Sequence, residues 1–286
     1  MVDQVGQKMN LTPCSQDYVF KYFSGLKAFL APITRRRIKH LSNKFLLKLE
    51  RGLQGDKIFS GEGNSYQKRN HIVRQFIKAG SGIEIGALHH PVKVRRGVTV
   101  KYIDRLTVDE LRQQYPELNN TQLVEVDILA DGETLTPIGS STQDFVIANH
   151  FLEHCQNPML ALKNMLRVLK HTGVLFVSIP DKRYTFDVNR PITTYDHLVK
   201  DYIEGPEVSR RQHFEEWVRL ANKVMDDIEV ERQIKHLMEI NYSIHFHVWT
   251  EPEMIEFFLK QKGTHDFEIE LFSRNINEMI FVLRKS

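Results

Sequence analysis

The sequence predicts an α/β fold, namely a Rossmann-like seven-stranded sheet that is mostly parallel, with an antiparallel last strand and helices on both faces. Residues 143–180 read as buried strand, polar turn, amphipathic helix and second buried strand, which is a βαβ unit. Three earlier apolar runs predict three more strands. The last two apolar runs are separated only by residues 274–277, so they are expected to pair as an antiparallel hairpin.

The elements before and within the βαβ unit have clear boundary signals. A helical pattern ends at Gly80, and Thr107 with Glu110 forms a capping box that begins the helix after the second strand. In the βαβ unit, Asn157 is expected to cap a helix that begins at Pro158, and Gly173 is expected to end it. The first helix is expected over residues 66–80, and the first three strands over residues 81–86, 98–104 and 122–128.

The second half of the chain departs from the repeating pattern. Residues 191–240 are polar and helix-prone, so we interpret them as a helical insertion whose longest helix spans residues 213–237. Thr250 and Glu253 cap a further helix, and the closing strands are expected over residues 266–273 and 278–285. The chain therefore divides into a basic helical N-terminal segment, residues 1–65, and one α/β domain, residues 66–286.

Composition is that of an ordinary soluble globular protein, with 41% hydrophobic and 26% charged residues. No apolar run has the length of a transmembrane helix, and the N-terminus lacks the apolar core of a signal peptide. The two cysteines, Cys14 and Cys155, do not make a disulfide framework. A cytoplasmic location is expected.

Positive charge is concentrated near the N-terminus. Residues 1–80 hold 15 lysines and arginines against 5 acidic residues, whereas the other 206 residues hold 24 against 31. The basic part is expected either to pack on the domain as a helical cap or to make a peripheral contact with an anionic membrane or an acidic partner. A nucleic-acid partner is not expected, because no nucleic-acid motif accompanies the charge. The oligomeric state is left open.

Polar residues lie where the first three predicted strands end. Glu84 lies within the first strand and Gly86 follows two residues later, while Asp104 ends the second strand. An acidic residue about 20 residues after a glycine-containing turn suits the hydroxyls of a ribose. Asp127 ends the third strand, and Ile128 after it is expected to line an adenine pocket. Because the carboxyl ends of parallel strands form the ligand-binding edge of such a sheet, these residues predict a nucleoside site.

With these residues the sequence resembles the class I S-adenosyl-L-methionine-dependent methyltransferases, in particular the type 11-like group in which the fourth strand runs into an H-x-L-E-H turn. The resemblance implies that S-adenosylmethionine is the cofactor and that residues 66–286 form a methyltransferase domain. It implies that Glu84 and the Gly86 turn hold the methionine end, that Asp104 binds both ribose hydroxyls, and that Asp127 bonds the adenine amine. The backbone at Asn149 and His150 is then expected to line the reacting sulfonium. The matching residues are Glu84, Gly86, Asp104, Asp127, the turn over residues 149–154, residues 167–170 and Gly173.

The first turn departs from the pattern of that family. Leu88 and His90 occupy positions that are usually glycine, and His89 lies between them. Fewer glycines restrict how closely a backbone can approach a ligand. The cofactor carries no phosphate, so a phosphate cradle is not required of this turn.

The same turn also matches the H-x-x-E-H pattern of a zinc hydrolase, with His150, Glu153 and His154. A zinc protease would need both histidines on one continuous helix, whereas here a strand precedes them and Pro158 follows. We therefore expect no metal at this motif. The H-x-H pair His245 and His247, in an expected strand, is interpreted as packing rather than ligation.

Residues after the fifth strand are candidates for binding the methyl acceptor. The candidate bases are His154 and His197, and a polar or anionic acceptor is expected to contact Asp181, Arg183 and Arg190. The same polar stretch contains Lys182, Asp187 and the run Phe186–Thr193, which suggests sugar or polysaccharide chemistry by analogy. The predicted function is therefore O-methylation of a polar or anionic small molecule. The alternative is a non-catalytic binding or scaffold protein that keeps the methyltransferase fold.

Overall fold

The computed structural model describes residues 65–286. The basic N-terminal segment predicted over residues 1–65 lies outside the described residues apart from Ser65, and so does Cys14. Within the described part of the chain, no helix is long and apolar enough to cross a membrane.

A seven-stranded sheet organises the described domain, as the sequence predicts, in the order β3-β2-β1-β4-β5-β7-β6. The first five strands are parallel, and β7 runs antiparallel to both β5 and β6, so β7 is the reversed strand of the closing hairpin. The strands are β1 (Ser81–Ile85), β2 (Thr99–Asp104), β3 (Ile128–Leu129), β4 (Gln143–Asn149), β5 (Leu169–Pro180), β6 (Phe267–Asn275) and β7 (Glu278–Lys285).

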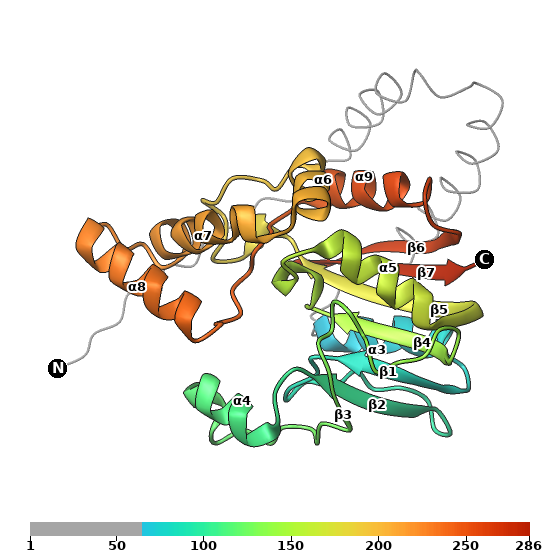
Figure 1. The fold of residues 1–286 in the computed structure, drawn as a ribbon. Coiled ribbons are helices and arrows are strands. Elements are labelled where there is room, and N and C mark those ends of the chain that lie inside the picture. The colour runs from blue at the N-terminus through green and yellow to red at the C-terminus, as the bar shows by residue number, and fades with distance from the viewer. Residues whose placement is uncertain (1–64) are drawn as a thin grey trace, which may run out of the picture. The chain divides into compact units, whose positions relative to one another are not determined.

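Helices cover both faces of this sheet. Ile72 and Val73 of α3 (Ser65–Phe76) pack against Phe176 and Val282 on one face. Side chains alternate between faces along a strand, so the neighbouring Phe281 points to the opposite face, where its ring lies 4.5 Å from that of Phe258 in α9 (Glu251–Gln261). Figure 1 shows α3 behind the sheet and α5 (Pro158–Val168) in front of it.

The capping signals in the sequence are confirmed. Thr107 caps α4 (Val108–Gln114) with a reciprocal bond to Glu110, and Thr250 with Glu253 does the same for α9. Asn157 accepts the Leu160 N–H at the start of α5. Short 3-10 turns follow α4 at Pro116–Leu118, β4 at Leu152–His154 and β5 at Lys182–Tyr184.

The third strand is shorter than predicted, because the chain over residues 122–127 does not join the sheet. The Asp127 carboxylate accepts the Tyr102 N–H at 2.8 Å, which occupies the donor that a longer strand would use. Pairing therefore begins only at Ile103 and Ile128. Leu129, and not Asp127 or Ile128, is the last residue of the strand.

The position of Gly173 also differs from the prediction. The helix α5 ends at Val168, and β5 begins directly at Leu169. Gly173 therefore lies within β5, where the pairing with β4 shifts register between Gln143 and Phe145. The glycine belongs to an irregularity of the strand and does not end the helix.

The insertion forms helices, but the prediction of one long helix over residues 213–237 is wrong. This stretch is divided between two helices. The first is α7 (Glu207–Glu216), which continues as a π-helical turn to Ala221, and the second is α8, which begins at Asp227 with Asp226 as its cap. The break lets Phe214 and Ile234 face each other in one apolar cluster with Phe246. The insertion comprises α6 (Tyr195–Glu204), α7 and α8 (Asp227–Glu239). In Figure 1, α7 and α8 lie beyond the carboxyl ends of the parallel strands.

The segment that carries the H-x-H pair, residues 242–249, is extended but is not a strand, and we call it the extended segment. Its contact with the sheet region is a single bridge between Asp181 and Trp249. It is held instead by Glu153, whose carbonyl accepts the Phe246 N–H at 2.8 Å and the His247 N–H at 3.3 Å. The H-x-H segment therefore packs directly on the turn after β4.

Candidate active site

A cavity of about 610 Å³ lies at the carboxyl ends of β1, β2 and β4, between the sheet and the insertion. Gly86, Asp104 and His150 line its sheet side. The other side is lined by Phe186 from the loop after β5, by Arg210 and Trp217 from the insertion, and by Tyr242 and His245 from the extended segment that follows the insertion. This is the edge of a parallel sheet at which ligands bind, so the sequence placed the site correctly at the level of the fold.

The first turn keeps an unusual backbone despite its missing glycines. Gly86 has φ +64° and donates its N–H to the Ile103 carbonyl at 2.9 Å, and no atom lies within 4 Å of where a Cβ would stand. Leu88 also takes a left-handed conformation, with φ +49°, at a position where the family resemblance expects glycine. Such a conformation in a leucine costs on the order of 1–3 kcal/mol. Both residues line the cavity, so a ligand can approach this backbone closely.

Glu84 lies beneath the cavity and does not line it. Its fully buried carboxylate accepts the Val92 N–H at 3.0 and 3.2 Å. Burial raises the pKa of Glu84 to about 8, although the Val92 N–H and the charge of Arg69 act in the opposite direction. The residue therefore ties the end of the first turn to β1, and its predicted contact with the cofactor stays a prediction.

Asp104 lines the cavity at the end of β2, where the sequence places it. Its Oδ1 accepts the Leu106 N–H at 3.2 Å. Burial raises the pKa of this carboxyl above its usual range. The position fits the predicted role in binding two ribose hydroxyls.

Asp127 and Ile128 do not line the cavity. The Asp127 carboxylate is exposed and bonded to Tyr102, on the outer side of the sheet edge. Residues 130–133 line the cavity in their place. Within that group, Asp131 Oδ1 accepts the N–H groups of Glu133 and Thr134 at 2.8 and 2.9 Å. The sequence prediction ended the third strand too early and therefore chose residues that precede this wall.

Asn149 and His150 end β4, but only His150 lines the cavity. Asn149 accepts a hydrogen bond from Ser178 at 2.5 Å. His150 has φ +49°, and its Nε2 lies 2.5 Å from Glu278. Burial lowers the pKa of His150, but the Glu278 and Glu153 carboxylates outweigh it and leave that pKa above its usual value. The two carboxylates therefore favour the protonated form of His150 at the edge of the cavity.

His154 lines the cavity as a neutral imidazole. Its Nδ1 lies 3.0 Å from the Ile244 carbonyl, which can only accept a hydrogen bond, so Nδ1 carries the proton. Desolvation of this partly buried side chain lowers the pKa of His154 to about 3. A base with so low a pKa removes protons poorly at neutral pH, which makes His154 a weak candidate for the base we expected.

The zinc-hydrolase interpretation of H-x-x-E-H is not supported by this geometry. His150 turns to Glu278, whereas His154 turns to Ile244. The three residues Leu152–His154 form one 3-10 turn and not a long helix. The two histidines of the motif therefore do not form the pair that such an enzyme needs.

His245 is the residue at this site that sequence reasoning missed. It lines the cavity, and its Nδ1 lies 2.6 Å from the Asp187 carboxylate. Arg190, which is 2% exposed, binds Asp187 at 3.0 Å and the carbonyls of His245 and Phe246 at 2.6 and 3.1 Å. Burial raises the pKa of Asp187, but its bonds to His245 and Arg190 outweigh burial and hold that pKa below its usual range. The carboxylate therefore accepts the Nδ1–H of His245 and orients its ring at the cavity.

Of Asp187 and His245, only Asp187 was indicated by the sequence as a candidate site residue. Asp187 belongs to the polar stretch after the fifth strand, whereas His245 lies 58 residues further along, in an H-x-H pair that we interpreted as packing. Chain folding alone brings the two together.

Glu153 adds a buried carboxylate beside these histidines. It is 1% exposed, and neither of its side-chain oxygens has a hydrogen-bond partner in the described structure. Its Oε1 lies 3.7 Å from His150 Nδ1, and its ligand atoms lie within 4.8 Å of those of His154 and His245. Burial raises the pKa of Glu153. The side chain thus contributes a proton-binding group next to the candidate base.

Four other predicted residues, Asp181, Arg183, Arg190 and His197, do not line the cavity. His197 lies 3.1 Å from both Asp201 and His213, in a separate cluster. Arg183 pairs with Asp181 at 2.5 Å, and its second partner is Glu251 at 3.3 Å. Because these side chains bind one another, they are poorly placed to contact an acceptor. Arg190 likewise acts on Asp187 and not on the cavity.

The comparisons with known proteins agree with this fold. Residues 78–177 match the family model described as a methyltransferase domain. No curated protein matches the chain.

Solved structures resemble the chain at low identity. One from Burkholderia thailandensis, a 1,6-didemethyltoxoflavin-N1-methyltransferase with S-adenosylhomocysteine, is 12% identical, with 89% of this chain and 92% of that chain covered and a TM-score of 0.44. A methyltransferase dependent on S-adenosylmethionine from Methanosarcina mazei is 16% identical, with 75% and 96% covered and a TM-score of 0.41. A Rhodobacter sphaeroides structure assigned to the zinc-dependent alcohol dehydrogenases is 14% identical, with 77% and 90% covered and a TM-score of 0.45. At these TM-scores the likenesses carry no functional conclusion for this chain.

Residues 78–177 are a methyltransferase domain, and the sheet that contains them has the class I fold that the sequence predicts. The matched region is that of a methyltransferase, and S-adenosylmethionine is the cofactor that such a domain on a class I fold implies. The residues present fit this cofactor, since the open face of Gly86 and the carboxylate of Asp104 meet at one cavity.

Proposed function

We propose that this enzyme methylates a hydroxyl oxygen of a polar or anionic small molecule, with a sugar or polysaccharide unit as the class of acceptor to test first. The observation that carries the proposal is the Asp187–His245 pair at the cavity, with 2.6 Å between carboxylate and imidazole. A hydroxyl has a high pKa and benefits from a base as it reacts, whereas an acceptor that is already ionised does not. A carboxylate-oriented histidine is such a base.

Each residue of the pair has a definite part in this reaction. S-adenosylmethionine, when bound, supplies an electrophilic methyl group. Nε2 of His245 accepts the proton that the hydroxyl oxygen loses. Asp187 accepts the Nδ1–H hydrogen bond and stabilises the imidazolium that results, and Arg190 holds both in place. The cavity orients the two reactants, which supplies much of the remaining rate acceleration.

The side of the cavity opposite the sheet favours a polar cyclic compound as the methyl acceptor. Phe186 is 55% exposed and its ring lies 4.9 Å from that of His245, so an apolar sugar face could stack beside the base. Arg210 also lines the cavity, and its buried Nε has no hydrogen-bond partner in the described structure. We assign to this guanidinium the binding of an anionic group, a role that was predicted for Arg183 and Arg190.

His245→Gln and Asp187→Asn should test the base directly. We expect each to lower kcat by about 10²–10⁴-fold, because a positioned base contributes this much, while the Kd for S-adenosylmethionine changes little. The assay is S-adenosylhomocysteine release with a panel of sugars, sugar phosphates, phenols and amines. His171→Gln, on an exposed part of β5, is the matched control. Full activity in His245→Gln with a hydroxyl acceptor would rule out the proposed base.

Calorimetry separates the enzyme from the alternative of a non-catalytic scaffold. A class I enzyme should bind S-adenosylmethionine measurably, and Asp104→Ala should weaken that binding about tenfold or more through the loss of charge-assisted hydrogen bonds. No binding at millimolar concentration would favour the scaffold. Turnover of amines but not of hydroxyl compounds would redirect the proposal to N-methylation.

A further inference from the structure

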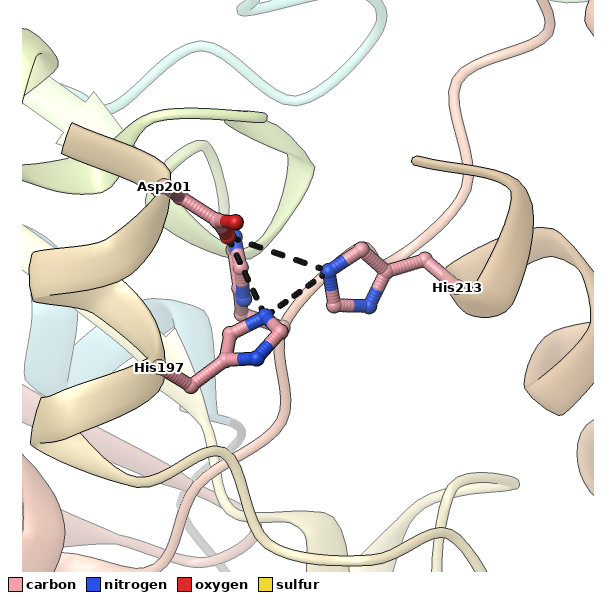
Figure 2. A group of neighbouring side chains, drawn as sticks. His197, Asp201 and His213 are labelled. Atoms are coloured by element: carbon pink, nitrogen blue, oxygen red, sulfur yellow. Dashed lines mark hydrogen bonds and ion pairs between the residues drawn. The ribbon is translucent and has the colours of Figure 1, made fainter. Parts of the chain in front are cut away.

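A cluster of three histidines and one aspartate lies in the insertion, away from the residues that line the cavity. Figure 2 shows His197 and Asp201 one turn apart on α6, with His213 reaching them from α7. The fourth member, His247, belongs to the extended segment after the insertion. We propose that these four side chains bind one divalent transition-metal ion, with zinc as the expected metal, in a closed structural site.

The distances in the cluster fit a tetrahedral ion. Asp201 Oδ2 lies 3.1, 3.9 and 3.9 Å from the Nε2 atoms of His197, His213 and His247, and the first two Nε2 atoms lie 3.1 Å apart. A tetrahedron with metal–ligand bonds of about 2.0–2.1 Å has edges of about 3.3–3.4 Å. All four ligand atoms lie within 4.8 Å of one another, so small side-chain movements would complete the coordination.

Burial makes the cluster difficult to explain without a ligand. Asp201 and His247 are fully buried and His213 is 5% exposed. Asp201 Oδ2 points into the cluster and has no hydrogen-bond partner in the described structure, although His197 Nε2 is near it. Buried carboxylate oxygens are nearly always paired, because an unpaired one costs several kcal/mol. A cation among the four ligands would satisfy this oxygen.

The surroundings of Asp201 are those of a metal ligand. Its other oxygen, Oδ1, accepts the Ser209 hydroxyl at 2.5 Å, which orients the carboxylate so that Oδ2 faces the histidines. One existing contact would be lost, since His247 Nε2 lies 3.3 Å from the Gln156 carbonyl. That contact is long for a hydrogen bond, and a metal bond would exceed it in strength.

The donor set indicates the metal and its role. Three imidazole nitrogens and one carboxylate oxygen suit zinc, and other late first-row ions can occupy the same set. Because four protein ligands fill the coordination sphere, the ion would be structural and not catalytic. It would connect α6 and α7 to the extended segment through His247, which lies two residues after His245 in the chain. This inference is independent of the proposed reaction.

Metal analysis of the full chain tests the site. The protein should be purified without a histidine tag or chelator and measured by elemental mass spectrometry in the absence of S-adenosylmethionine. We expect about one zinc per chain, reduced at least tenfold in Asp201→Asn and in His213→Gln. His236→Gln, which changes an exposed histidine on α8, should retain the wild-type zinc content. Circular dichroism of each variant would show that the fold persists.

Cobalt titration keeps the test valid where a variant fails to fold. Cobalt added to the metal-free wild-type chain should produce the visible absorption of a tetrahedral ion without a thiolate charge-transfer band, which distinguishes these ligands from a cysteine site. Wild-type protein that contains no zinc and shows no such absorption would overturn the proposal. So would zinc that is retained in a folded Asp201→Asn, His213→Gln double variant.

Discussion

Three of the four histidines that line the cavity, His150, His154 and His245, have neighbours that give them different properties. His150 lies against two carboxylates that raise its pKa. His154 instead donates its Nδ1–H to the Ile244 carbonyl and has a pKa of about 3. His245 is oriented by the ionised Asp187. The three rings therefore lie in different surroundings: His150 beside carboxylates, His154 against a carbonyl, and His245, the candidate base, against Asp187.

Glu84 leads to a prediction about pH at the scale of one residue. Its pKa is about 8 in the folded state against 4.5 as the ordinary value, so between these limits the folded protein holds a proton that the unfolded chain has lost. Raising the pH through this window therefore favours unfolding. Glu84→Gln should remove this contribution, so the loss of unfolding free energy from pH 5 to pH 7.5 should be about 2–3 kcal/mol smaller than in the wild type. Urea denaturation at both pH values measures it, and equal pH dependence in the two proteins would contradict the buried, protonated carboxyl.

At the scale of elements, the break between α7 and α8 shapes the far wall of the cavity. Asp226 accepts the Glu229 N–H and so begins α8, which allows the two helices to enclose Phe214, Ile234 and Phe246. The apolar pattern over residues 213–237 is continuous, so periodicity alone predicts one helix. The cap residue interrupts that pattern, and the divided helices bury Phe214 and Ile234 against Phe246.

Asp226→Ala tests this explanation. We expect it to reduce the free energy of unfolding by about 1 kcal/mol, because one N–H at the start of α8 loses its acceptor. Hydrogen exchange should show faster exchange in the first turn of α8 and little change in β4 and β5. Asp196→Ala in α6 is the control, since that residue follows the cap Thr194 without being the cap itself. A change confined to the sheet would be inconsistent with a capping role.

At the scale of the whole molecule, cofactor binding should stabilise the domain, because the cavity joins the sheet to the insertion. S-adenosylmethionine at about 100 times its Kd should add about 2.7 kcal/mol, which corresponds to a rise in Tm of roughly 5 °C or more. Asp104→Ala, which should weaken binding about tenfold, should reduce this stabilisation to about 1.4 kcal/mol and so remove about half of the rise at the same ligand concentration. Asp127→Ala should retain it, because its carboxylate contacts Tyr102 outside the cavity. If Asp127→Ala abolished the rise in Tm instead, Asp127 would contact the adenine as the sequence predicts.

Much of the architecture could be predicted because it depends on local signals. Alternating and continuous apolar runs specify strands, and Thr107, Asn157 and Thr250 mark helix starts through hydrogen bonds within four residues. Asp104 and His150 were placed at the cavity because parallel strands share one carboxyl edge. The third strand was less predictable, because its length depends on a bond between Asp127 and a neighbouring strand.

The sequence by itself determined the class of fold, the edge of the sheet that binds the cofactor and the methyltransferase resemblance, since all three follow from short-range patterns. Only the tertiary structure decided which polar side chains act together. His245 meets Asp187 across 58 residues, and His197 and Asp201 meet His213 and His247 from different elements. Side-chain hydrogen bonding and coordination depend on distances of a few ångströms, and spacing along the chain does not determine these distances once the chain folds back on itself.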